Sequence, residues 1–142
     1  MPRRLKPMSS PLTRSETMRR VRSTDTAPEM KVRRALHAAG LRYRLHRADL
    51  PGKPDVVLPR YRCVVLVHGC FFHSHPGCGR ARVPATRQDY WIPKLRRNAE
   101  RDRRNEGALM AARWKVRIVW ECKLRDPERL PQLVAEIKGT RD

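Results

Sequence analysis

Apolar residues recur at three- and four-residue intervals in three stretches of the chain, a spacing typical of helices that pack on one side. In the first stretch, 27–39, Thr26 is placed to act as the N-cap and Glu29 to complete a capping box. Gly40 follows as a residue suited to the left-handed conformation that often ends a helix. The buried stripe of this helix is predicted to contain Val32, Ala35, Leu36 and Ala39.

The other two helices are predicted in the second half of the chain. Stretch 94–113 begins directly after Pro93, which favours a helix start at that point. Its inward-facing residues are predicted to be Leu95, Ala99, Leu109 and Met110. A closing helix ends before Gly139, and its stripe consists of Leu130, Leu133, Val134 and Ile137.

Four further stretches carry the alternating or continuous apolar pattern of strands. These stretches are 41–45, 55–58, 61–67 and 115–120. A turn at Pro59-Arg60 would join the second and third of them as an antiparallel hairpin that pairs Asp55 with Val64. In that register Val67 and His68 lie three to four residues beyond Asp55, so the hairpin would have to kink to bring the three together.

The predicted order is helix, three strands, a long loop over 69–90, helix, strand and helix. This order indicates an α/β fold with a mixed central sheet flanked by helices. A loop of that length is uncommon inside a compact domain unless a metal or a function stabilises it. Residues 23–142 are predicted to form a single domain.

The chain of 142 residues has a net charge of +19, from 33 Lys and Arg against 14 Asp and Glu. Such a charge favours a polyanionic partner, nucleic acid above all, because binding releases counterions from phosphates. Of the cations 26 are Arg, which suits phosphates and guanine edges, although codon bias would give the same count. Stretch 1–22 is either a solvated tail or a basic arm that becomes ordered on DNA.

A cluster of Cys and His follows the third predicted strand. Cys70, His75 and Cys78, joined by Cys122 from beyond the last strand, would complete a closed Cys3His zinc site. The alternative is a set of buried or incidental thiols, which is how we interpret Cys63 within its strand. Four cysteines in a reducing compartment favour metal ligands over disulfides.

Two other residues have the chemistry of a hydrolytic site. Asp55 opens a strand, where a carboxylate can hold Mg²⁺ against a phosphate. His73 is left over if the other four residues fill the zinc site, and it can then take a proton from water as a general base. It could instead be a fifth candidate for the zinc site.

Several separated motifs now agree in order and spacing with one family. They are PGKPD at 51–55, YRC at 61–63, HGCFFH at 68–73, VPATR at 83–87, ERDRR at 100–104 and VWEC at 119–122. Together they resemble the very-short-patch-repair (Vsr) mismatch endonucleases. The similarity spans about 14–130, and the family fold resembles the PD-(D/E)XK restriction-endonuclease core.

The resemblance implies an Mg²⁺-dependent endonuclease that nicks one strand 5′ to the thymine of a T:G mismatch left by deamination of 5-methylcytosine. Asp55 matches the metal-binding aspartate, and the backbone carbonyl of Val67 matches a second Mg²⁺ ligand. His73 matches the general base, which Asp102 would orient. Further active-site positions match Glu29 and His68, so capping and catalysis both remain open for Glu29, and the zinc positions match the four residues already proposed.

The same resemblance implies how the mismatch is reached. Phe71, Phe72 and Trp91 match an aromatic wedge that enters the duplex, and Met18 matches a residue that probes from the opposite groove. Lys94 and Asn98 match residues that contact the mismatched bases. The chain departs from the family in having Phe72 in place of tryptophan and one extra residue between His75 and Cys78.

Two other functions remain open at this point. A non-catalytic, zinc-stabilised nucleic-acid-binding protein would share the charge and the cluster, and a restriction-type endonuclease would cut matched DNA. Nothing near the N-terminus resembles a signal peptide, and no apolar stretch approaches the roughly 18 residues of a membrane span. We expect a monomer in the bacterial cytoplasm, associated with the nucleoid, with other mismatch-repair proteins as candidate further partners.

Overall fold

The computed structural model describes residues 25–139, so the predicted arm at 1–22, with Met18 in it, lies outside the described residues. Within 25–139 the strands form one sheet in the order β1-β2-β3-β4. Their bounds are β1 (Arg44–Leu45), β2 (Val56–Leu58), β3 (Cys63–His68) and β4 (Lys115–Trp120). The pairs β1–β2 and β2–β3 are antiparallel and β3–β4 is parallel, which confirms the predicted mixed sheet.

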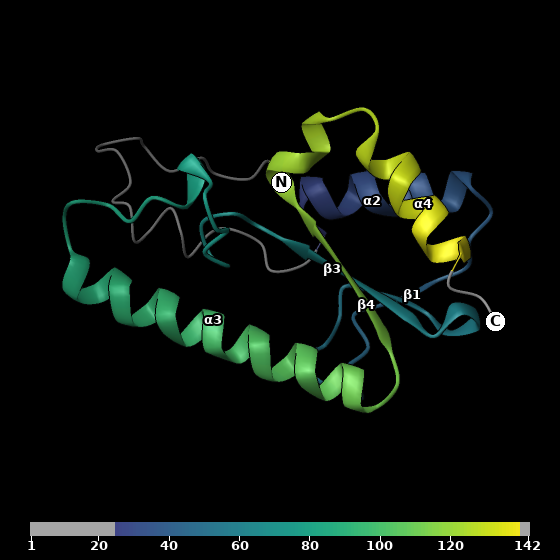
Figure 1. The fold of residues 1–142 in the computed structure, drawn as a ribbon, viewed down its shortest axis with the longest axis horizontal. Coiled ribbons are helices and arrows are strands. Elements are labelled where there is room, and N and C mark those ends of the chain that lie inside the picture. Colours follow the sequence, from purple (N-terminus) through teal and green to yellow (C-terminus); the bar gives the residue numbers. More distant parts are fainter. Residues whose placement is uncertain (1–24, 140–142) are drawn as a thin grey trace, which may run out of the picture.

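Helices cover both faces of this sheet. The helices are α2 (Ala27–Ala38), α3 (Gln88–Ala111) and α4 (Arg129–Gly139). Short 3-10 helices lie in the connections at Pro59–Tyr61, Gly79–Ala81 and Glu121–Arg125. Helices α2 and α4 lie side by side on one face, and α3 runs along the other (Figure 1). None of the helices in the described part of the chain is long and apolar enough to cross a membrane.

Two hydrophobic clusters form, one on each face of the sheet, because successive side chains of a strand point in opposite directions. The larger cluster joins α2 and α4 to the sheet and includes Val32, Leu36, Val56, Leu58, Cys63, Val65, Val119, Leu133 and Ile137. The smaller one lies under α3 and consists of Val57, Val64, Leu109 and Trp114. Strands β2 and β3 are therefore buried on both faces, which explains their continuous apolar sequence.

The caps of α2 follow the sequence prediction in two of three respects. Thr26 is the N-cap, and its side-chain oxygen accepts a hydrogen bond from the Glu29 backbone N–H at 3.3 Å. Gly40 adopts the left-handed conformation, with φ of +77°. The carboxylate of Glu29, however, faces His46 and Arg33, so the prediction that it completes a capping box is wrong.

Helix α3 begins six residues earlier than predicted. It starts at Gln88 and contains Pro93 within it, so the use of Pro93 as a helix start was wrong. Trp91 explains the difference, because its side chain is only 2% exposed and anchors the added turn against the protein. Met110 was also predicted to face inward, but 59% of it is exposed.

The hairpin has a different register from the one predicted. Val57 pairs with Val64 and Leu58 with Cys63, so the turn holds four residues, including a 3-10 helix and the left-handed Arg62. The longer turn shifts the pairing of the two strands by two residues relative to the prediction. The end of β3 therefore lies closer to the start of β2. Asp55 consequently lies beside Val67 without any kink in the hairpin.

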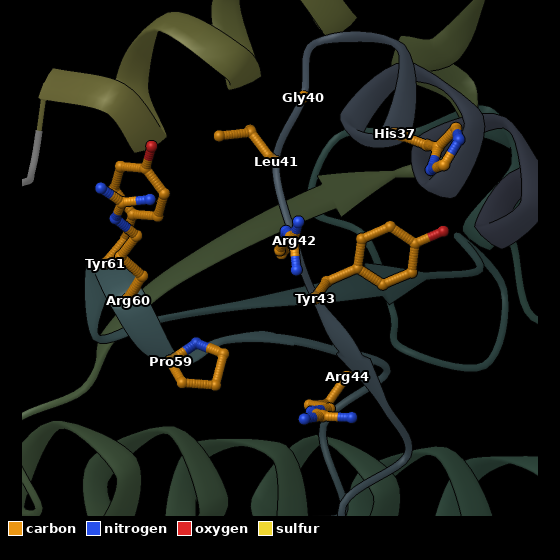
Figure 2. A pocket seen from close by; sticks show the side chains of 9 residues that line it. All are labelled: His37, Gly40, Leu41, Arg42, Tyr43, Arg44, Pro59, Arg60 and Tyr61. Atoms are coloured by element: carbon orange, nitrogen blue, oxygen red, sulfur yellow. The ribbon is translucent and has the colours of Figure 1, made fainter.

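Strand β1 is shorter than the five residues predicted, because its partner strand ends at Leu58 and Pro59 provides no backbone N–H to continue the ladder. Residues 41–43 and the turn Pro59–Tyr61 diverge around a cavity of about 570 Å³ (Figure 2). It lies at the turn end of the hairpin, away from Asp55 and His68. His37 at the end of α2 also lines it.

Candidate active site

A second cavity, of about 290 Å³, lies where β3 ends and β2 begins. Its wall contains most of the predicted catalytic residues, although their positions in the sequence span almost fifty residues. They are Asp55, Val67, His68, His73 and Asp102. His46, Lys53 and Asn105 also line this cavity and were not predicted.

Asp55 faces the cavity from the residue before β2. Its Oδ2 accepts a hydrogen bond from the Val67 backbone N–H at 2.8 Å. The pKa of Asp55 is raised to about 6, chiefly by burial and also by the nearby charge of Glu29, while the Val67 hydrogen bond, His46 and His73 act in the opposite direction. The carboxylates of Asp55 and Glu29 thus lie close together in a partly buried setting, and a bound cation would relieve the repulsion between them.

Two imidazole rings lie against each other beside Asp55. His68 and His73 are stacked, with ring centres 3.9 Å apart and planes within 3°. His73 Nδ1 lies 2.6 Å from Asp102 Oδ2. A neutral His73 that donates its Nδ1–H to this carboxylate presents Nε2 as a proton acceptor, as a general base requires.

His68 differs from its neighbour in burial and in charge. The pKa of His68 is lowered to about 4, chiefly by burial and also by the charge of His73, while Asp102 acts in the opposite direction, so His68 is neutral near pH 7. Its Nδ1 is buried and has no hydrogen-bond partner within residues 25–139. An unsatisfied buried nitrogen beside a cavity is suited to contact a ligand that enters it.

Glu29 contributes a third acidic group next to the cavity, from the first turn of α2. It is only 1% exposed, and its two carboxylate oxygens lie 3.2 and 3.1 Å from His46 Nε2. Arg33 Nη1 lies 3.3 Å from the same carboxylate and 2.7 Å from Asp25. A buried carboxylate requires such charged partners, and a capping role would not supply them.

The predicted zinc ligands come together on the other side of Trp120. The donor atoms of Cys70, His75, Cys78 and Cys122 all lie within 4.8 Å of one another, and we call these four residues the thiol–imidazole cluster. Tetrahedral Zn–S bonds of about 2.3 Å place two sulfurs about 3.8 Å apart, so this spacing suits zinc. His73 lies outside the cluster, bonded to Asp102, which argues against it as a fifth ligand.

Trp120 connects the thiol–imidazole cluster to the cavity. Its ring stacks on His75 with centres 4.1 Å apart, and its edge meets His68 at 5.1 Å. Glu121, the next residue, accepts a hydrogen bond from the Cys70 backbone N–H at 3.1 Å. The strand pattern over 115–120 carries no signal for either contact.

The predicted aromatic wedge is only partly at the surface. Phe71 and Phe72 are half-buried, and Phe71 meets Phe72 and Trp91 edge to face, each at 5.3 Å. Trp91 lies inside α3 and is buried, so its ring is not exposed as a wedge residue would be. In the described structure, Trp91 therefore packs against Phe71 from the protein interior.

One face of α3 carries residues from both the wedge region and the cavity. Asn98 donates a hydrogen bond to the Phe72 carbonyl at 3.3 Å, and Lys94 donates to the Tyr90 hydroxyl at 3.2 Å. Three- and four-residue steps along the helix then lead to Asp102 and Asn105 at the cavity. The residues of this face are Trp91, Lys94, Asn98, Asp102, Asn105 and Leu109.

The loop before β2 packs closely against α3 because it contains Gly52. This residue has φ of +73°, and a β-carbon on it would come within 2.8 Å of the Asn105 side chain. Only glycine combines that backbone conformation with so close an approach. The contact fixes the loop that precedes Asp55 relative to the helix that carries Asp102.

Sequence comparison identifies the family to which these residues belong. Residues 8–79 match the family described as DNA mismatch endonuclease Vsr. The DNA mismatch endonuclease Vsr of Escherichia coli is 48% identical over 118 residues, which cover 83% of this chain and 75% of that relative. This chain belongs to the Vsr family. Membership of the Vsr family is consistent with the predicted nuclease core.

Two further relatives are named as nicking enzymes. The type II nicking enzyme V.XorIIP of Xanthomonas oryzae pv. oryzae is 52% identical over 117 residues, covering 82% of this chain and 85% of that relative. The type II nicking enzyme V.NmeAIP of Neisseria meningitidis is 43% identical over 129 residues, covering 88% and 91%. The similarity therefore extends over most of the chain in each case.

Proposed function

We propose that this Vsr family member nicks one strand of duplex DNA 5′ to the thymine of a T:G mismatch and so initiates very short patch repair. The observation that carries the proposal is the cavity in which Asp55, His68 and the His73–Asp102 pair meet. Relatives over most of the chain are named as a mismatch endonuclease and as nicking enzymes, which supports DNA cleavage as the reaction.

Mg²⁺ is the cofactor that we propose for this cavity, held by the Asp55 carboxylate and the Val67 backbone carbonyl. Supporting this, the raised pKa of Asp55 reflects a buried carboxylate whose negative charge is only partly balanced, with Glu29 nearby. When bound there, Mg²⁺ would polarise the scissile phosphate and offset the charge that develops on it.

His73 acts as the general base in this mechanism. Its Nε2 accepts a proton from the attacking water while Asp102 holds the ring through Nδ1. The water oxygen bonds to phosphorus, the bond from phosphorus to the leaving sugar oxygen breaks, and that oxygen takes up a proton from solvent. Neutral His68 can donate its N–H to a phosphate oxygen without adding a second positive charge.

We propose structural zinc at the thiol–imidazole cluster. The donor set of three thiols and one imidazole, and the mutual distances of its atoms, support this assignment. A closed site of that kind stabilises the loop between β3 and α3, which has little regular structure of its own. The loop also carries Phe71, Phe72 and His73, so zinc would fix the positions of the wedge and the base together.

The wedge explains how a mismatch could be selected. Phe71 and Phe72 would enter the stack with Trp91 as their support, and Lys94 and Asn98 would face the mismatched bases from the next turns of α3. A wobble pair costs less to separate than a matched pair, so unstacking itself discriminates between them. Met18, outside the described residues, would probe from the other groove.

A single labelled duplex tests the proposal, prepared with and without one T:G pair and incubated with and without Mg²⁺. We expect one nick, in the thymine strand on the 5′ side of that thymine, only when both the mismatch and Mg²⁺ are present. Cleavage of the matched duplex would favour a restriction-type endonuclease. Tight binding without any cleavage would favour a non-catalytic DNA-binding protein.

A further inference from the structure

His46 has a backbone conformation that ties it to the start of β2. It directly follows β1 and has φ of +47°, which is uncommon for a residue with a side chain. Its backbone N–H donates a hydrogen bond to the Asp55 carbonyl at 3.1 Å. Residues in uncommon conformations persist where their surroundings over-determine them, and such positions cluster at functional sites.

The ring of His46 has a separate set of contacts. Its Nε2 lies between the two oxygens of Glu29, at 3.1 and 3.2 Å, and the residue forms part of the cavity wall with Asp55. The same residue therefore holds the side chain of one acid and the main chain of another.

The group Asp25, Glu29 and His46 has the composition of a cation site, but its geometry indicates another role. The guanidinium of Arg33 already lies against both acids, 2.7 Å from Asp25 and 3.3 Å from Glu29. A second cation would have to displace it. Arg33 and His46 thus hold the Glu29 carboxylate from two sides in one fixed orientation.

We infer that His46 is a positioning residue for the nicking reaction, and the inference rests on the proposed function. Its ring fixes the Glu29 carboxylate, and its backbone fixes the residue that carries the Asp55 carboxylate, so the two acids keep a constant separation. A metal held at Asp55 requires this separation to be reproducible, because outer partners orient the groups that bind it.

Two substitutions distinguish the role of the His46 ring from the role of its backbone. Asparagine tolerates the left-handed conformation but is too short to reach Glu29, so His46→Asn removes only the ring contact. His46→Gln restores a donor of nearly the original reach. His37→Asn is the matched control, because His37 is an exposed histidine at the end of α2 and lines the other cavity.

Nicking of the T:G duplex under single-turnover conditions is the first measurement. We expect His46→Asn to lower the rate about 10- to 100-fold, with duplex affinity changed by less than about threefold. The rate of His46→Gln should return to within about fivefold of wild type, and His37→Asn should match wild type. A His46→Asn rate equal to wild type overturns the inference.

A second measurement does not depend on cleavage. Mn²⁺ binding is followed by electron paramagnetic resonance in the complex with a T:G duplex that carries a methylphosphonate at the scissile position. His46→Asn should weaken Mn²⁺ about tenfold, and His46→Gln should restore it. Loss of folding in His46→Asn, or equal damage by both substitutions, would assign His46 a structural role instead. Failure of wild type to nick in Mg²⁺ would instead refute the proposed function.

Discussion

Among single residues, Asp55 has the most direct role in the proposed chemistry. It lies where β2 begins and β3 ends, and its carboxylate is held by the peptide of Val67 instead of by an arginine or lysine. Pairing with a fixed cation would lower its pKa, whereas here burial raises it to about 6. This setting leaves the carboxylate available to a metal.

Replacing Asp55 by asparagine keeps the size of the side chain and removes its charge. We expect Asp55→Asn to lower Mg²⁺-dependent nicking by more than about 100-fold, since loss of an outer partner alone costs about 10- to 100-fold. Binding to the T:G duplex should remain within about threefold, because phosphate contacts dominate affinity. Asp49→Asn, at an exposed acid, is the control with the same charge change. Unchanged nicking by Asp55→Asn would remove Asp55 from the site.

The raised pKa of Asp55 also predicts a dependence of stability on pH. The folded protein holds a proton on this group up to a pH of about 6, whereas the unfolded chain releases it near 3.8. Its contribution is therefore fully present below the unfolded pKa and is lost as pH rises through the folded pKa. Between about pH 4 and pH 7, the wild-type free energy of unfolding should fall by at most about 3 kcal/mol relative to Asp55→Asn.

Urea unfolding at each pH, in buffer that contains zinc and lacks Mg²⁺, measures this difference. Comparison with Asp55→Asn cancels the contributions of other groups that titrate in the same range. Parallel curves for the two proteins would mean that the carboxylate is not buried as described.

At the scale of elements, the segment between β3 and α3 depends on contacts from distant parts of the chain. Its short 3-10 helix, Gly79–Ala81, provides few backbone hydrogen bonds. Cys122 lies 47 residues beyond His75, yet its Sγ comes within 3.4 Å of His75 Nδ1. A bond through a shared metal would close this long loop and hold the segment in place.

Loss of one cluster thiol should therefore unfold more than the loop. We expect Cys122→Ser to lose bound zinc and to become insoluble or unfolded, because a structural site contributes folding energy directly. Cys63→Ala is the control, since Cys63 is buried in β3 and lies outside the cluster. Metal analysis and circular dichroism measure both effects. Folded wild-type protein without stoichiometric zinc would return the cluster to the alternative of incidental thiols.

The wedge can be tested within the same segment. Base–aromatic stacking is worth about 1–3 kcal/mol per base, so Phe72→Ala should weaken binding to the T:G duplex roughly 5- to 150-fold. Binding to matched duplex rests on phosphate contacts and should change much less. Met110→Ala, at an exposed apolar residue on the far part of α3, controls for a general loss of surface. Equal losses on both duplexes would assign Phe72 to packing.

For the whole molecule, the sequence predicted the arrangement of helices and strands correctly but not the register of the hairpin. The helix stripes and the strand runs predicted the mixed α/β sheet, because each pattern reflects burial on a particular face. The register of the hairpin was wrong because the conformation of Arg62, which lengthens the turn, leaves no mark in the apolar pattern.

The candidate site was predicted in part for the same reason. The spacing of Cys and His residues predicted the cluster, and the family resemblance predicted the His73–Asp102 pair. His46 and Trp120 were missed because their roles arise from contacts between elements far apart in sequence, and a histidine or tryptophan in a strand region has no distinctive spacing. The start of α3 was missed because a buried tryptophan outweighed the usual position of proline.

The net charge of +19 predicts how binding responds to salt. Affinities for matched and T:G duplexes should both fall steeply between about 50 and 200 mM salt, since each phosphate contact releases counterions. Their ratio should change much less, because stacking by Phe72 and its neighbours does not depend on ions. Titrations of both duplexes at several salt concentrations measure the two slopes. If the affinities for the two duplexes became equal at high salt, discrimination between them would be electrostatic.

The single face of α3 that runs from Lys94 to Asp102 has a consequence for where DNA is cut. Eight residues at 1.5 Å each separate these positions by about 12 Å along one rigid axis. On the proposed assignment, one end of this axis touches the damaged pair and the other orients the base that activates water. The offset between lesion and incision is then a length built into one helix, and one inserted residue would turn the two ends about 100° apart.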